Sequence, residues 1–203
     1  PIASLKPGRS KYVLLLDERG YVMDDGMVNR DSETRFTLTF TSGGSTHAEL
    51  WVRDWAESLE CDVRIMNVTQ ALGAINLTGP RATELLQRAG VTTPPAFMQH
   101  TRAAVAGVDC RIYRLSFTGE VSYELHHAAH DSVRLWRALL DLGRDLGIRP
   151  HGLEALMRLR LEKGHLIVGQ DTEFDSTPRR LNHEWAVRMD TPAFVGQIGR
   201  AHV

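Results

Sequence analysis

The chain has 203 residues, 42% of them hydrophobic and 24% charged, and its 24 Lys and Arg nearly balance its 25 Asp and Glu. This length and composition are typical of one large globular domain or of two small domains packed together. The lack of a basic excess argues against a nucleic-acid-binding surface. The longest apolar runs are far shorter than the roughly 20 residues of a membrane-spanning helix, so neither a membrane span nor a secretory leader is expected.

Two further features bear on the setting of the protein. Cys61 and Cys110 are too few for a disulfide framework and too isolated for a zinc site, which favours buried thiols in a reducing cytoplasm. Pro1 is not a translation start. We therefore expect a processed chain or a piece of a longer protein.

The first half of the chain predicts strands around one helix. Alternating apolar residues favour strands over 11–17, 21–30 and 35–41. A helix is predicted over 46–59, opened by a capping box of Thr46 and Glu49. Two more strands are expected from apolar residues at 63–68 and 74–77, and a further helix begins after Pro80.

The second half continues this mixture. Residues 91–106 contain adjacent prolines and no periodicity, which predicts a connecting loop and the best candidate for an internal boundary within a 1–203 domain. Strands are expected from 108 towards 117 and over 123–127, and a helix follows that ends near Gly147. A last helix is predicted over 151–163, with four residues largely inward: Leu153, Leu156, Met157 and Leu161. The uneven alternation indicates an α+β fold with mixed or antiparallel sheets and packed helices.

Asp24 and Asp25 follow a strand-like run and precede Gly26. Because successive side chains in a strand point to opposite faces, one of the two carboxylates can be buried. The alternative, favoured by the usual exposure of charged residues, is a solvated acidic turn.

A second candidate carboxylate lies where a turn leads into the strand over 123–127. Glu120 and Glu124 lie on either side of this junction between turn and strand. A carboxylate can accept a pair of N–H donors through its two oxygens. A surface role is the alternative. The nearby His126, His127 and His130 are interpreted as surface histidines rather than metal ligands, and no dinucleotide- or phosphate-binding fingerprint occurs.

Four segments resemble, in order and spacing, the folate-binding domain of the aminomethyltransferase family. They are ERGYVMDD at 18–25, LTGP at 77–80, FTGEVSYE at 117–124 and RLRLEKGH at 158–165, the last continuing to GQD at 169–171. The family includes the T-protein of the glycine cleavage system and the tetrahydrofolate domains of sarcosine- and dimethylglycine-oxidising enzymes. The resemblance spans nearly the whole chain and looks closer to the α subunit of heterotetrameric sarcosine oxidase than to the free T-protein.

This resemblance implies roles for five residues. Asp25 matches the family aspartate that lies against the reduced pterin near N5 and N10, where a carboxylate can take a proton or stabilise a cation. Glu124 is expected to accept the paired donors of the pterin's aminopyrimidinone edge. Trp185 matches an aromatic residue near the folate, although a core tryptophan remains the alternative. Phe117 and Tyr123 are expected in the same folate site.

The implied function is a tetrahydrofolate-binding domain that receives a one-carbon unit from an iminium derived from a methylated glycine, in a sarcosine oxidase α-like enzyme. Flavin and NAD would belong to missing segments or to flavoprotein partner subunits. A stand-alone T-protein-like aminomethyltransferase is one alternative, but Phe117 and Leu156 stand where T-proteins carry Tyr and Arg. A non-catalytic folate-binding module and an inactive truncated piece are the others.

Overall fold

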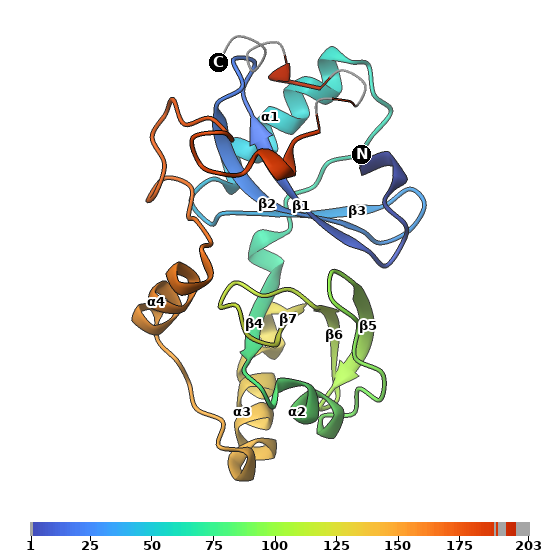
Figure 1. The fold of residues 1–203 in the computed structure, drawn as a ribbon. Coiled ribbons are helices and arrows are strands. Elements are labelled where there is room, and N and C mark those ends of the chain that lie inside the picture. Colours follow the sequence, from blue (N-terminus) through green and yellow to red (C-terminus); the bar gives the residue numbers. More distant parts are fainter. Residues whose placement is uncertain (1, 189, 191–193, 198–203) are drawn as a thin grey trace. The chain divides into compact units, whose positions relative to one another are not determined.

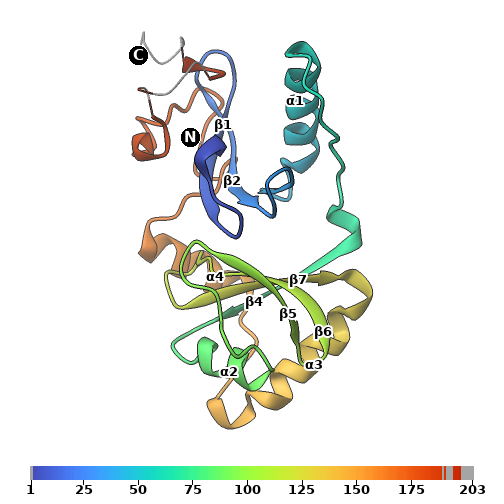
Figure 2. The same cartoon turned by 90° about the vertical axis from the view of Figure 1, so that its right-hand side faces the viewer.

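The computed structural model describes residues 2–188, 190 and 194–197, drawn as a ribbon in Figure 1 and turned by 90° in Figure 2. The strands are β1 (Ser10–Leu16), β2 (Val22–Arg30), β3 (Phe36–Phe40), β4 (Leu72–Thr78), β5 (His100–Val105), β6 (Val108–Tyr113) and β7 (Ser122–Ala128). The α-helices are α1 (Ser45–Ser58), α2 (Ala82–Arg88), α3 (Ser132–Leu142) and α4 (Leu153–Lys163). Short 3₁₀ helices are η1 (Ile2–Ser4), η2 (Thr69–Ala71), η3 (Ala129–Asp131), η4 (Arg144–Leu146) and η5 (Glu184–Ala186). The α+β class is thereby confirmed.

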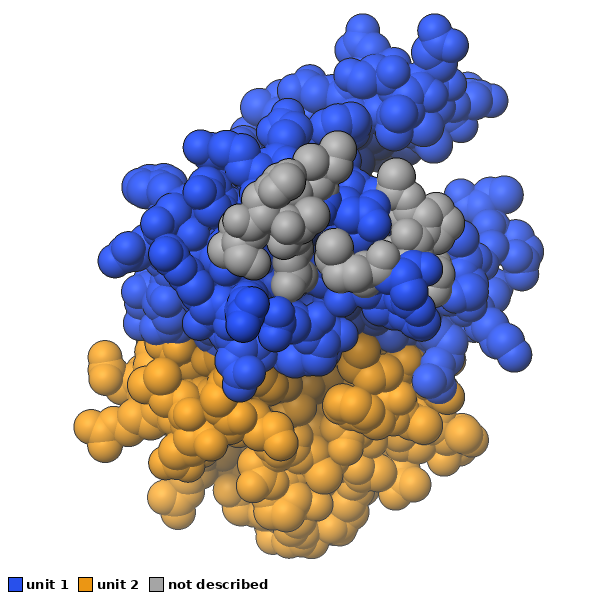
Figure 3. Space-filling view, turned by 45° about the horizontal axis from the view of Figure 1, so that its top comes forward, with its two compact units in different colours: residues 1–67, 166–203 blue, residues 68–165 orange. Residues whose placement is uncertain are grey.

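The chain forms two compact units, coloured separately in Figure 3. Unit 1 comprises residues 1–67 and 166–203, and unit 2 comprises residues 68–165. Residues 91–106, where the sequence favoured an internal boundary, lie inside unit 2. None of the helices in the described ranges combines the length and the apolar character that crossing a membrane requires.

Unit 1 is built on an antiparallel sheet in the order β1-β2-β3, which confirms the three predicted strands. Helix α1 follows β3 and confirms the predicted helix, but the capping box is wrong. The helix begins before Thr46, its N-cap is Gly44, and no side chain caps it. Glu49 instead accepts hydrogen bonds from Arg53 and Asn67.

Residues 176–186 return to this sheet. The backbone N–H of Val22 donates to the carbonyl oxygen of Ser176 at 2.8 Å, and η5 contacts β1. In both ribbon views the part of unit 1 that follows α4, drawn from dark orange to red, lies beside β1 and β2. Residues far apart in the sequence are thereby brought to the same strand.

The segment between α1 and unit 2 corrects two expectations. Residues 61–68 form no strand; their apolar side chains Val63 and Val68 are exposed and pair with no neighbouring strand. Cys61 lies here as an exposed free thiol, whereas Cys110 is buried as expected. Alternation of apolar residues therefore did not suffice to make a strand where no partner strand is available.

Unit 2 is an antiparallel sheet in the order β4-β7-β6-β5. Helices α2 and α3 cover one face of it (Figure 2). The core between them contains buried apolar side chains from the sheet and both helices, among them Leu86, Ile112, Leu125 and Leu135. The predicted strands over 74–77 and 123–127 and the helix after Pro80 are confirmed. The strand expected from 108 towards 117 ends at Tyr113, and the helix expected to end near Gly147 ends at Leu142 and is followed by η4.

The prediction of a loop over the whole of 91–106 is wrong, because part of this segment is a strand. Edge strand β5 occupies its last residues and pairs with β6 through a two-residue turn at Ala106 and Gly107. Both turn residues have positive φ, 49° and 78°, as in the type I′ turns that match the twist of a hairpin. Small residues in β5 masked this hairpin in the sequence.

Helix α4 buries a different face from the one expected. Leu153 and Leu161 are 74% and 60% exposed, whereas Arg160 is 1% exposed. Leu156 and Met157 are half-buried. The inward stripe of α4 thus ends on an arginine, and Arg160 donates from Nη1 to the carbonyl oxygen of His165 at 3.1 Å.

Candidate functional site

The two adjacent aspartates lie in the interior of strand β2, the central strand of unit 1, and not in a solvated turn. Asp24 faces Leu15 and Asp25 faces Leu14 in the pairing with β1. Because neighbouring side chains of a strand point to opposite faces, the two carboxylates have different surroundings. Asp24 is 2% exposed, and Asp25 is half-buried.

The Asp24 carboxylate holds β2 to the loop that precedes α1. Its Oδ1 accepts hydrogen bonds from the Thr41 hydroxyl at 2.9 Å and from the Asp25 N–H at 2.8 Å. A Cβ added to Gly44 would lie 2.1 Å from its Oδ2. This close packing leaves no room for a ligand, so the contacts of Asp24 are structural.

The Asp25 carboxylate lies on the other face and is held by one phenol. The Tyr12 hydroxyl donates to Asp25 Oδ2 at 2.8 Å. Burial raises the pKa of Asp25 above its ordinary value, against the lowering effects of the Tyr12 hydrogen bond and of the nearby His183. Burial, followed by the charge of Asp25, raises the pKa of Tyr12, so Tyr12 stays the donor.

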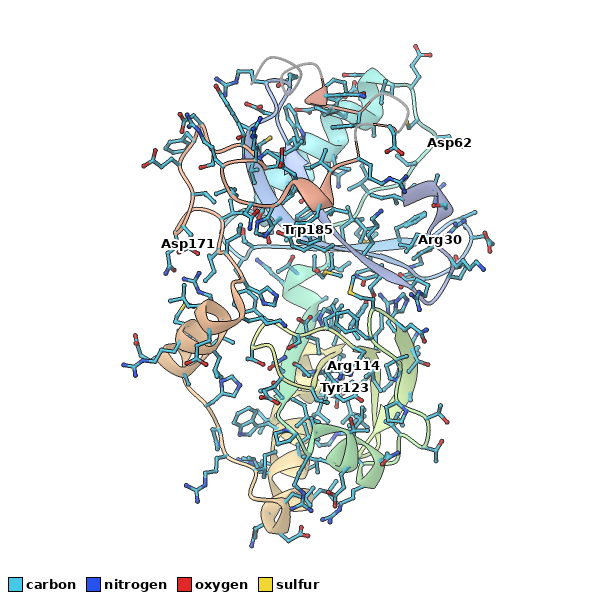
Figure 4. All side chains as sticks on the ribbon, viewed as in Figure 1. Arg30, Asp62, Arg114, Tyr123, Asp171 and Trp185 are labelled. Carbon is cyan, nitrogen blue, oxygen red and sulfur yellow. The ribbon has the colours of Figure 1, made fainter. Side chains whose placement is uncertain are left out.

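Two further rings pack around Tyr12, the residue that holds this carboxylate. The Trp185 ring stacks on Tyr12 with centroids 5.3 Å apart and an interplanar angle of 27°, and the His183 ring lies 5.5 Å from Trp185. Trp185, labelled in Figure 4, comes from η5. Its exposed fraction is 67%, so the alternative of a core tryptophan is wrong. Unit 1 thereby offers an open aromatic face beside a partly desolvated carboxylate.

The sequence reasoning did not identify Tyr12 and His183. Alternation along β1 places Tyr12 on the same face as Leu14. Had the pairing of β1 with β2 also been predicted, with Leu14 opposite Asp25, the phenol of Tyr12 would have been expected next to the carboxylate. His183 comes from the returning segment, which no local pattern ties to β2.

The second carboxylate, Glu124, lies on β7 of unit 2. Its Oε2 is 3.3 Å from His126 Nε2, and its side chain is 33% exposed. Asn76 and Tyr113 face it across the strand pairs on either side. Glu120 is exposed in the preceding turn, as expected.

The other two predicted folate contacts lie in unit 2 with different surroundings. The Phe117 ring stacks on the His165 ring at 5.6 Å and 13°, and His165 Nδ1 donates to the Phe117 carbonyl at 2.8 Å. Tyr123 is 2% exposed, its hydroxyl shares a hydrogen bond with Thr83, and the Arg114 guanidinium lies over its ring (Figure 4). This burial gives Tyr123 a packing role and leaves its ring no open surface for a ligand.

The histidines of β7 point to opposite faces. His127 is 2% exposed and bonds the Leu125 carbonyl and the Ser132 hydroxyl, so the interpretation of His127 as a surface residue is wrong. Among the described residues, no group of three or more His, Cys, Asp and Glu side chains is arranged to hold a metal ion.

Comparison with known proteins places the chain in a defined group. A family model described as the GCVT N-terminal domain matches residues 1–191. The chain is 32% identical over 191 residues to a sarcosine oxidase subunit alpha from Corynebacterium sp. (strain P-1), covering 90% of this chain and 20% of that protein. It is 28% identical over 198 residues to an aminomethyltransferase from Halothermothrix orenii, covering 97% of this chain and 55% of that protein.

A solved structure agrees with these matches. The crystal structure of the glycine cleavage system aminomethyltransferase T from Bartonella henselae superimposes with a TM-score of 0.86 at 28% identity, covering 98% of this chain and 54% of that one. The chain therefore spans about half of the aminomethyltransferases it matches and a fifth of the sarcosine oxidase subunit.

Proposed function

The chain belongs to the GCVT N-terminal domain family, and from this premise we propose that it binds tetrahydrofolate and supports transfer of a one-carbon unit to it. The observation that carries the proposal is the half-buried Asp25 carboxylate, which accepts a hydrogen bond from the Tyr12 hydroxyl, with the exposed Trp185 ring stacked on Tyr12.

The described residues suit a reduced pterin. A planar ring can stack on the open face of Trp185, which keeps 67% of its surface exposed. The partly exposed Glu124 carboxylate can accept paired N–H donors, the pattern that an aminopyrimidinone edge presents. The replacement of the T-protein Tyr and Arg by Phe117 and Leu156 removes two polar groups from this set, which favours the sarcosine oxidase-like role over T-protein activity.

Tetrahydrofolate, when bound, would supply the nitrogen that captures the iminium carbon, and that nitrogen would then have a proton to lose. Asp25 is the group that takes this proton or balances the positive charge, and its raised pKa makes it a better proton acceptor than an exposed aspartate. Tyr12 fixes the carboxylate by donating to Oδ2.

We further propose that the other components of the reaction lie outside this chain. The iminium would come from a methylated glycine oxidised by a flavoprotein segment or subunit outside this chain, where flavin and NAD would also bind. Both cysteines are free thiols, which supports a reducing, cytoplasmic setting.

Paired substitutions in the full-length enzyme test the role of Asp25. Asp25→Asn should lower formation of methylene-tetrahydrofolate by about 10²–10⁴-fold, the usual contribution of general acid–base help, with a much smaller change in folate affinity. Asp24→Asn is the matched control and should change transfer little, because its contacts are structural. Equal losses of transfer in both variants would contradict the assignment.

A further inference from the structure

Four polar side chains of β6 and β7 lie next to one another on one face of the sheet in unit 2, and we call them the polar square. Glu124 and His126 alternate with Leu125, which belongs to the core, so both point to the face opposite α2 and α3. Tyr113 of β6 is paired with Glu124, and Arg111 is paired with His126.

His126 is tightly held within the polar square. Its ring centroid lies 4.7 Å from that of Tyr113, and its side chain is 13% exposed. Arg111 Nη1 in turn donates to the Tyr113 hydroxyl at 3.3 Å. The imidazole of His126 therefore packs against Tyr113, whose own hydroxyl is held by Arg111.

The fixed imidazole contacts the carboxylate through one oxygen. His126 Nε2 lies 3.3 Å from Glu124 Oε2, and with its proton on Nε2 the imidazole donates to this carboxylate oxygen. Without this contact, Glu124, a long and one-third-exposed side chain, would sample several rotamers. Ordering such a side chain on binding weakens affinity by about 2- to 12-fold.

We propose that His126 is a positioning residue that holds the Glu124 carboxylate in the orientation that receives the N–H edge of a reduced pterin. This inference rests on the proposed function. His126 acts through Glu124 and touches no ligand itself, so its effect depends on where its hydrogen-bond donor lies rather than on its charge or size.

Two amide substitutions of His126 separate a positioning role from a general structural one. In His126→Gln the side-chain amide nitrogen reaches the place of Nε2, whereas in His126→Asn it ends near the place of Nδ1. Calorimetric titration of the full chain with tetrahydrofolate should show His126→Gln within about twofold of the wild type and His126→Asn weakened about 2- to 12-fold. Both substitutions are polar and lie outside the apolar core, so similar melting temperatures are expected.

A Glu124→Ala background completes the test. His126→Asn should cause no further loss of affinity there, because the side chain it positions is gone. Equal affinities of the Gln and Asn variants, or an undiminished Asn effect in the Glu124→Ala background, would overturn the inference while leaving the proposed function intact. A wild-type chain without affinity for tetrahydrofolate would overturn both.

Discussion

At the scale of single residues, the structure gives two neighbouring aspartates unlike roles. Asp24 is buried against Thr41 and Gly44. Asp25 is only partly desolvated and accepts a hydrogen bond from the phenol of Tyr12. A carboxylate held in partly desolvated surroundings costs stability when it is ionised. Functional residues commonly carry such a cost.

Because the ionised Asp25 carboxylate lowers the stability of the fold, Asp25→Asn should increase that stability in a pH-dependent way. The folded-state pKa of Asp25 lies above its ordinary value of 3.8, so the folded protein binds this proton more tightly than the unfolded chain. Its contribution to stability is therefore favourable at low pH and is lost as pH rises from about 3.8 through the raised pKa. Thermal denaturation should show a higher melting temperature for Asp25→Asn than for the wild type near neutral pH, and a smaller difference in acid.

Exposed Glu120 provides the control for that comparison. Glu120→Gln makes the same change of charge and should leave the melting temperature unchanged at both pH values. A lower melting temperature of Asp25→Asn at neutral pH would show instead that the ionised carboxylate stabilises the fold.

At the scale of elements, local sequence patterns predicted most strands and helices but not their partners. Strands β1 to β3 and helix α1 came from alternation and helical spacing, which act over a few residues. The expected strand at 63–68 failed because no strand lies beside it, and β5 was missed because pairing with β6, not apolar content, makes it a strand. The buried Arg160 of α4 likewise depends on contacts that a helical wheel does not contain.

The same dependence on partners places Asp25. Alternation on β2 predicted that one of the two carboxylates could be buried, but it did not predict which one. Thr41 and Gly44 bury Asp24 on one face of the strand. Tyr12, with Trp185 stacked on it, contacts Asp25 on the other face.

Strand β2 offers an element-scale test. Gly26, next to Asp25, pairs with Val13 and Phe40, and a Cβ there would lie 1.9 Å from the carbonyl oxygen of Thr39. Gly26→Ala should lower the free energy of unfolding by about 1–3 kcal/mol, because the obstructing atom is backbone and the strands must separate. Chemical denaturation measures the change.

Gly43 in the loop before α1 is the matched control. A Cβ there meets no atom within 4 Å, so Gly43→Ala should change the free energy of unfolding by less than about 0.5 kcal/mol. Similar losses in both variants would mean that the close approach at Gly26 does not limit the sheet.

At the scale of the whole molecule, each unit contains residues for which the proposed function expects a folate contact. Asp25, Tyr12 and Trp185 belong to unit 1, and Glu124 and Phe117 belong to unit 2. Each unit has its own sheet, and unit 2 has its own apolar core. Affinity for tetrahydrofolate can be measured without the flavoprotein components.

Calorimetric titration of the chain with tetrahydrofolate is the most direct test of the central claim, with the wild type run beside Glu124→Gln and Glu120→Gln. The account predicts saturable heat for the wild type, affinity weakened about 10- to 150-fold in Glu124→Gln through loss of a charged hydrogen bond, and affinity within about twofold in Glu120→Gln. Heat from flavin but none from tetrahydrofolate, or unchanged folate affinity in Glu124→Gln, would contradict it.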